Sequence, residues 1–182
     1  CNIYVRTPRA GQRVMEGIKT FIGKKLKLKV NEKKSAVARP RERKFLGFSF
    51  MGNREAKRRI APQAIERFKK RVRELTRRTR GMSLRQMIEN LTPYVRGWGN
   101  FFSFCQTPSV MEELNAWLRR RLRSVLWRQW RSGRRRYAQL RRLGVHRSRA
   151  AYAAGRQDGP WRMSISIALR QGLSDSYLIS LG

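Results

Sequence analysis

The sequence has 182 residues, a length that suits one domain or two small ones. Its 44 Lys and Arg against 11 Asp and Glu give a formal net charge of +33, yet 40% of the residues are hydrophobic. This apolar content excludes a simple disordered basic tail, and the absence of a long apolar run excludes a membrane-spanning helix. The charge predicts a polyanionic partner, for which nucleic acid fits better than an anionic membrane surface or an acidic protein.

The N-terminal part of the chain is predicted to combine strands with one helix. Residues 2–6 are rich in residues that favour strands. Apolar residues recur at helical spacing over 9–25, whereas they alternate with period two over 26–30 and 45–50. We therefore expect a strand, a helix and two further strands before residue 60.

The remainder of the chain is predicted to be helical. Apolar residues predict a first helix between Pro62 and Gly81 and a second that begins with a capping box at Ser83–Gln86. Pro93 predicts a kink or a break in the second helix. A long amphipathic helix is expected to begin at Thr107, because a proline follows it, and another basic helix is expected over 134–143 after a break at Gly133.

The sequence lacks a recognisable set of catalytic or metal-binding residues. Its single histidine, His146, lies in a basic stretch that suits a structural role or a nucleic-acid contact better than catalysis. Cys1 and Cys105 are too few for a zinc site and form no disulfide framework. Glu112 and Glu113 are adjacent, but they suit the start of a helix, where the dipole favours negative charge. We therefore predict no catalytic residue, no metal and no cofactor in this chain, which indicates a binding protein.

Arginines interleaved with aromatic residues are the positive signal for function. Arginine can bind phosphate with two parallel hydrogen bonds, and aromatic rings can stack on unpaired bases. The candidate nucleic-acid contacts are Arg119, Arg120, Arg123, Trp127, Arg128, Trp130, Arg131, Arg134, Arg135 and Arg136. For Trp127 and Trp130 a place in the core is an equally open alternative, whereas helical spacing favours the core for Trp98 and Trp117. Every cation after Lys70 is an arginine, for which codon bias is a competing explanation.

Several motifs together resemble a known family. Residues 91–102, LTPYVRGWGNFF, resemble the core signature of the group II intron maturase-specific domain. Further stretches similar to the family follow in the same order at 107–114, 117–123, 126–130, 141–145, 159–162 and 175–182. Within these motifs, five residues are expected to set helix packing: Gly97, Trp98, Phe101, Phe102 and Trp161.

The N-terminal part is similar to the end of the palm in group II intron reverse transcriptases. Residues 1–6 resemble the strand after the YADD motif, and 26–35 and 45–50 resemble the last two conserved palm blocks. The resemblance implies an α+β chain, in which 1–60 are a strand-helix-strand-strand remnant of the palm and 61–182 are an all-α thumb, or maturase, domain. The family's Asn-x-x-Lys-Ser pattern makes Lys34 a candidate nucleic-acid contact, although Lys33 stands where many members have glutamate.

The resemblance also implies an activity and partners. Full-length members are encoded in mobile introns, copy RNA into DNA with Mg²⁺ in the palm, and bind intron RNA through the thumb to promote splicing. The aspartates of the YADD motif, the fingers and the HNH endonuclease segment are absent from this sequence. We therefore expect no polymerase activity from this chain alone, with Mg²⁺ only in the full-length enzyme. The implied partners are group II intron RNA, the template–primer duplex and the missing fingers and palm, in the bacterial cytoplasm.

Two other interpretations stay open at this point. An unrelated basic RNA-binding protein, such as a ribosomal protein, would share the charge, although the five Trp and the ordered motifs argue against it. A truncated intron copy without a present function would keep the same motifs. In that case the strand expected at 2–6 would lack a partner, and an unpaired edge strand favours aggregation.

Overall fold

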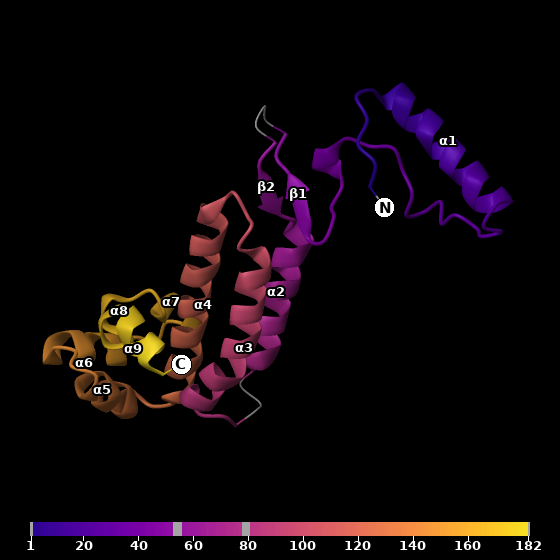
Figure 1. The fold of residues 1–182 in the computed structure, drawn as a ribbon. Coiled ribbons are helices and arrows are strands. Elements are labelled where there is room, and N and C mark those ends of the chain that lie inside the picture. The colour runs from indigo at the N-terminus through magenta and orange to yellow at the C-terminus, as the bar shows by residue number, and fades with distance from the viewer. Residues whose placement is uncertain (1, 53–55, 78–80, 182) are drawn as a thin grey trace. The chain divides into compact units, whose positions relative to one another are not determined.

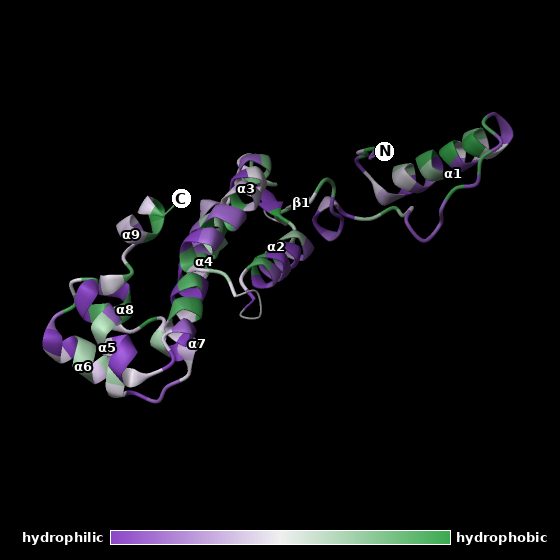
Figure 2. Cartoon of the chain, turned by 90° about the horizontal axis from the view of Figure 1, so that it is seen from below, coloured by the Kyte–Doolittle hydropathy of each residue, from purple (hydrophilic) through white to green (hydrophobic). Residues whose placement is uncertain are grey.

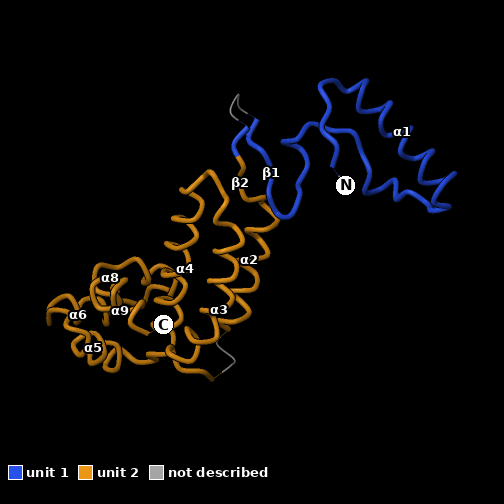
Figure 3. Tube along the Cα trace, viewed as in Figure 1, with its two compact units in different colours: residues 1–57 blue, residues 58–182 orange. Residues whose placement is uncertain are grey.

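The computed structural model describes residues 2–52, 56–77 and 81–181, so Cys1 and Gly182 of the terminal motifs lie outside it. The described chain is mostly helical, at 63%, with a small two-stranded antiparallel sheet, which confirms the α+β class. It divides into two compact units, Cys1–Lys57 and Arg58–Gly182, close to the boundary expected at residue 60 (Figure 3).

Among its described residues, the first unit has one α-helix, which matches the prediction for 9–25. Helix α1, Pro8–Lys24, begins after Thr7, whose Oγ1 accepts a hydrogen bond from the Ala10 backbone N–H at 3.2 Å (Figure 1). A short 3-10 turn, Pro40–Glu42, and strand β1, Phe48–Phe50, follow. Much of the apolar surface in this unit is exposed, namely Ile3, Tyr4, Val5, Phe21, Leu26, Leu28, Val37, Phe45 and Leu46. The unit therefore buries little apolar surface of its own.

Two of the predicted strands are wrong. Residues 2–6 and 26–30 are described and do not pair as strands. Of the segment 45–50 only β1 forms, and it pairs with β2, Arg58–Ile60, which the sequence pattern did not predict. Alternating apolar residues supply one face of a strand, but a strand forms only where a second backbone accepts and donates its hydrogen bonds.

Three long helices lie side by side in the second unit and share its first core. They are α2, Pro62–Leu75, α3, Leu84–Phe102, and α4, Pro108–Gln129 (Figure 1). Their buried side chains include Phe68, Val72, Met87, Ile88, Leu91, Leu114 and Leu122. Figure 2 shows hydrophobic and hydrophilic residues along each of these helices, as expected where one side is buried.

The ends of these helices largely follow the sequence signals. Ser83 and Gln86 form the predicted capping box at the start of α3. Helix α3 continues through Pro93, so the predicted break does not occur. Thr107 precedes α4, but its hydroxyl makes no capping hydrogen bond and instead lies 3.0 Å from Cys105 Sγ.

The C-terminal part of the second unit has its own core, built from short helices and the end of α4. The helices are α5, Gly133–Arg142, α6, Arg147–Gly155, α7, Pro160–Met163, α8, Ile167–Gly172, and α9, Asp175–Ser180. The predicted break between α4 and α5 is present, because α4 ends at Gln129 and α5 begins at Gly133 after the capping residue Ser132. His146 caps α6, with Nδ1 accepting from the Ser148 backbone N–H at 3.4 Å, which agrees with a structural role.

Candidate nucleic-acid interface

Exposed arginines gather on α5, α6 and the residues that join them to their neighbours. We call five of them the α5–α6 arginine set: Arg131, Arg134, Arg135, Arg142 and Arg147. Within the described residues, none of them has a carboxylate at ion-pair distance. Three of the predicted contacts, Arg131, Arg134 and Arg135, therefore present guanidinium groups to solvent. The α5–α6 arginine set can bind phosphates without first breaking an internal ion pair.

Trp127 and Trp130 are buried, which favours the core over base stacking, the two alternatives that the sequence left open. They are 0% and 5% exposed, and their rings meet edge to face with centroids 6.2 Å apart in the second core. A ring without an exposed face offers no surface for a base. Their three-residue spacing was compatible with either role, and only the packing of α5 and α6 against the end of α4 decides between them.

Arg136 also turns inward from the basic run on α5. Its Nε donates to the Trp130 carbonyl at 2.9 Å, and its guanidinium carbon lies 4.6 Å from the centroid of the Trp127 ring. This arrangement ties the start of α5 to the end of α4 through a hydrogen bond and a cation–π contact. Arg136 therefore has a structural role within the second core, in contrast to its exposed neighbours Arg134 and Arg135.

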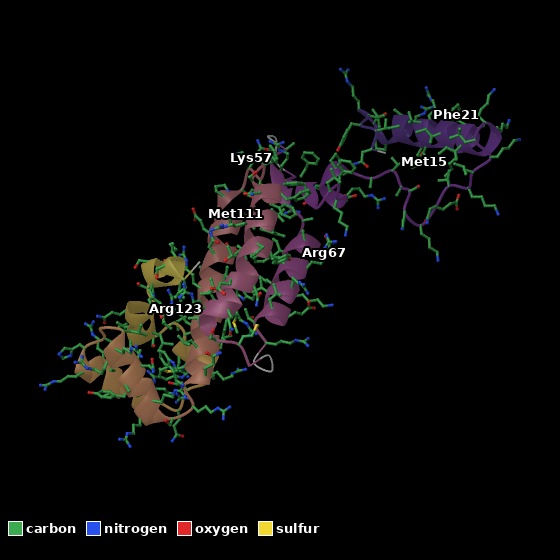
Figure 4. All side chains as sticks on the ribbon, turned by 60° about the horizontal axis from the view of Figure 1, so that its bottom comes forward. Met15, Phe21, Lys57, Arg67, Met111 and Arg123 are labelled. Carbon is green, nitrogen blue, oxygen red and sulfur yellow. The ribbon has the colours of Figure 1, made fainter. Side chains whose placement is uncertain are left out.

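Arg119 and Arg123 are bound to a single carboxylate. Arg119 Nη1 lies 2.8 Å from Asp175 Oδ2, and Arg123 Nη2 lies 3.0 Å from Asp175 Oδ1. Arg123 Nε also donates to the Leu173 carbonyl at 3.0 Å, and its side chain is only 11% exposed (Figure 4). Burial lowers the pKa of Arg123, while the neighbouring Asp175 carboxylate opposes that shift. The two arginines join α4 to α9, so Arg123 is not available as a phosphate contact.

Arg120 connects α4 to α7. Its Nε donates to Ser164 Oγ at 3.4 Å, its Nη2 donates to the Trp161 carbonyl at 3.3 Å, and its guanidinium carbon lies 4.1 Å from the Trp161 ring centroid. Together with Arg119 and Arg123, it lines an open groove of about 410 Å³. Trp161, expected to pack, thus contributes by orienting Arg120.

The other expected packing residues divide into two groups. Trp98 lies between Phe68 and Phe102, with each pair of ring centroids 4.5 Å apart, so Trp98 and Phe102 pack as predicted. Phe101 is 52% exposed and meets the edge of the Phe102 ring at 4.9 Å. A Cβ on Gly97 would meet nothing within 4 Å, so no close approach of another helix explains this glycine.

Lys34 and Arg128 are both exposed but lie in different units. Lys34 follows α1 in the first unit, where its backbone N–H donates to Asn31 Oδ1 at 3.1 Å and its carbonyl accepts from Arg43 Nη2 at 3.1 Å. The hydrogen bond to Asn31 closes a local turn at Lys34. Arg128 lies in the last turn of α4 in the second unit.

The structure also reveals cationic residues between α2 and α4 that the sequence interpretation did not select. Lys69 Nζ and the Arg73 guanidinium carbon lie 5.8 Å and 5.6 Å from the Trp117 ring centroid. Arg121 Nε donates to Thr76 Oγ1 at 3.0 Å. The four-residue spacing of Lys69 with Arg73, and of Trp117 with Arg121, places each pair on one face of its helix. No local sequence signal indicated that these two helix faces come into contact.

Neither a metal-binding cluster nor a membrane-crossing helix is found in the part of the chain that the structure describes. No group of three or more His, Cys, Asp or Glu residues there could bind a metal ion. In the same residues, no helix combines the length and the apolar character needed to cross a membrane.

Comparison with known families agrees with the motif resemblance over part of the chain. Residues 65–144 match the model of the group II intron, maturase-specific domain. The match supports the resemblance of this chain to the C-terminal part of a group II intron maturase. The match covers less than half of the chain. It begins in the first turn of α2 and ends two residues after α5. No curated protein sequence matches the chain. A maturase domain indicates a function in group II intron splicing and implies association with group II intron RNA.

Proposed function

We propose that the helical unit binds group II intron RNA directly and stabilises the fold in which the intron splices. The observation that carries this proposal is the maturase match over 65–144, which contains the exposed arginines Arg131, Arg134, Arg135 and Arg142. Arginines without internal carboxylate partners can replace the counterions around phosphates, so binding is driven by counterion release and weakens steeply with salt.

In this proposal the RNA performs the splicing chemistry and the protein changes the population of RNA folds. A protein shifts such an equilibrium only by its difference in affinity for the two states. A rigid protein surface can provide such a difference in affinity. The surface on α5 is rigid because Ser132 caps this helix and Arg136 joins it to the end of α4. Phosphates that come together only in the active RNA fold would then meet guanidinium groups already in position.

We also propose that residues 1–60 correspond to the end of a reverse-transcriptase palm and 61–182 to its thumb. The order of the palm-like and maturase-like motifs supports this assignment. In full-length members the Mg²⁺ ions and the polymerase chemistry belong to the aspartates that this sequence lacks. The helical unit would then contact the template–primer duplex in such an enzyme, and a primer-extension assay of this 182-residue chain with Mg²⁺ is expected to show no synthesis.

A splicing assay tests the main proposal. The chain is added to a panel of group II intron transcripts at a Mg²⁺ concentration where the RNA alone splices slowly, and the rate of lariat formation is measured. We expect at least one transcript to splice faster and to bind more tightly than ribosomal RNA of similar length. Equal binding of both RNAs would favour the unrelated basic RNA-binding protein, and binding without any acceleration would favour a copy that has lost its function.

A further inference from the structure

Helices α2 and α4 bring their cationic side chains together along one side of the three-helix bundle. Lys69 and Arg73 of α2 both lie within 6 Å of the Trp117 ring centroid on α4, at 5.8 Å and 5.6 Å. One turn further along both helices, Arg121 Nε donates to Thr76 Oγ1 at 3.0 Å, and its Nη2 lies 3.5 Å from the Thr76 carbonyl. The two helices therefore run in the same direction at this contact, with cations on both.

Helical periodicity extends this contact along α4. Trp117, Arg121 and Arg128 follow one another at intervals of four and seven residues, which places them on one face of the helix. Lys69 and Arg73 are four residues apart and share a face of α2 in the same way. We call Lys69, Arg73, Arg121 and Arg128 the α2–α4 cation band.

The α2–α4 cation band has no acidic counterpart among the residues that the structure describes. None of its members has a carboxylate at ion-pair distance there, whereas Arg71, two residues before Arg73, pairs with Glu74 at 3.2 Å. Burial lowers the pKa of Arg121, and the positive charges of Arg128 and Arg73 lower it further. Like charges repel, and a half-buried cation has lost part of its hydration. An external polyanion would reduce both costs.

The contacts within the band also orient its side chains before any ligand arrives. The Trp117 ring restricts Lys69 and Arg73 from one side, and Thr76 anchors the Nε edge of Arg121. Side chains that are already ordered lose less conformational entropy when they bind. The band therefore differs from a solvated row of surface lysines and arginines, whose side chains must be ordered by the ligand.

We propose that the α2–α4 cation band binds the phosphodiester backbone of a nucleic acid, as a second contact surface besides the α5–α6 arginine set. The identity of the nucleic acid as intron RNA rests on the proposed function, whereas the surface itself does not. Figures 1 and 2 both show α4 between α2 and the pair α5 and α6 within the second unit, so the two sets of cations belong to different helix pairs.

A matched pair of variants on α2 tests this proposal. Arg73→Gln removes a band cation, while Arg71→Gln removes a cation that already has a carboxylate partner, so the net charge changes equally. Affinity for a fluorescent group II intron transcript is measured over a series of salt concentrations. We expect Arg73→Gln to weaken binding about three- to tenfold and to reduce the slope of log affinity against log salt by about 0.7 to 1. We expect Arg71→Gln to remain within about twofold of the unmodified chain, because an exposed ion pair contributes little.

A second pair of variants guards against effects on folding. Arg128→Gln changes an exposed residue of the band, and Arg85→Gln changes an exposed arginine that pairs with Glu89 on α3. Melting temperatures of all four variants are compared with that of the unmodified chain. Equal weakening by the band variants and their controls would overturn the proposal, since only net charge would then matter. Normal binding by both band variants would overturn it as well.

The same measurements separate this inference from the proposed function. If the unmodified chain binds intron RNA and ribosomal RNA equally, but Arg73→Gln weakens both more than Arg71→Gln does, the band is a phosphate-binding surface and the maturase proposal fails. Poly-glutamate of matched charge serves as a competitor. Poly-glutamate that displaces the RNA equally well from the unmodified chain and from Arg73→Gln would show that Arg73 contributes equally to binding carboxylates and phosphates. The band would then not be selective for phosphates, and the proposal would be wrong.

Discussion

The immediate neighbours of each guanidinium decide what an arginine does in this chain. Arg123 is nearly buried and bound to Asp175 and the Leu173 carbonyl, whereas Arg128, in the last turn of the same helix, is exposed. Both residues looked alike in the sequence, because each lies in a basic run next to apolar residues. The two residues differ because Arg123 lies on the side of α4 that contacts α9, whereas Arg128 faces solvent.

Replacing the shared carboxylate should destabilise the protein. Asp175→Asn removes the counter-charge of Arg119 and of the nearly buried Arg123, and hydrogen bonds to charged groups typically contribute about 1.5–3 kcal/mol. We expect the free energy of unfolding in urea to fall by about 1–3 kcal/mol. Glu89→Gln, which breaks the exposed pair with Arg85, is the control and should cost less than about 0.5 kcal/mol. Equal effects of the two changes would show that the Asp175 contacts are not important for stability.

Trp127 should matter for stability far more than for direct contact with RNA. Its side chain is fully buried, and truncating a buried Trp typically costs about 3–5 kcal/mol. We expect Trp127→Ala to lower the urea midpoint strongly or to prevent folding of the second core. Trp161→Ala, at a residue that is 39% exposed, should cost clearly less. A well-folded Trp127→Ala variant that loses only RNA affinity would instead restore the stacking interpretation.

Whole helices follow their local sequence signals more faithfully than strands do. The period of apolar residues and the capping box at Ser83 correctly predicted α3, and the basic stretch expected to be helical over 134–143 closely matches α5. A helix satisfies its backbone hydrogen bonds within itself, so local sequence is sufficient information. The segments 2–6 and 26–30 have a strand-like pattern but no paired backbone, and β2 forms at Arg58–Ile60, where no such pattern was recognised.

The capping box of α3 offers a direct test at this level. Ser83→Ala removes the hydroxyl that accepts from the Gln86 backbone N–H at 3.3 Å, and loss of such a cap typically costs about 1 kcal/mol. We expect a decrease of that size in the free energy of unfolding, measured in urea. Ser103→Ala, at the other end of α3, removes only an exposed hydrogen bond to the Asn100 carbonyl and should change stability less. An unchanged stability in Ser83→Ala would contradict the role of the cap.

The two units differ in how much apolar surface they bury. In the second unit, two clusters of buried side chains extend from Phe68 to Leu178, whereas the first unit exposes Tyr4, Phe21, Leu28 and Phe45 among others. Burial of apolar surface is the main favourable term in folding, so the second unit is expected to be the more stable one.

Limited proteolysis should reveal this difference. Chymotrypsin at low concentration is expected to cleave first at exposed aromatic residues of the first unit, such as Tyr4, Phe21 and Phe45, and to leave a resistant fragment that begins close to Arg58. Mass spectrometry of the fragments measures the order of cleavage. Early cuts within α2 or α4, before any cut in the first unit, would contradict the expected order of stability.

Composition, helical periodicity and ordered motifs were sufficient to predict the α+β class with a helical maturase-like part, because local periodicity and the order of motifs are properties of the chain itself. They could not show that Trp127 and Trp130 are buried, that Arg119, Arg120 and Arg123 join α4 to the C-terminal helices, or that Lys69 and Arg73 meet Trp117. Each of these outcomes depends on residues distant in the sequence that come together only when the helices pack. The +33 charge thus predicts the class of partner, and the packing determines which arginines are exposed.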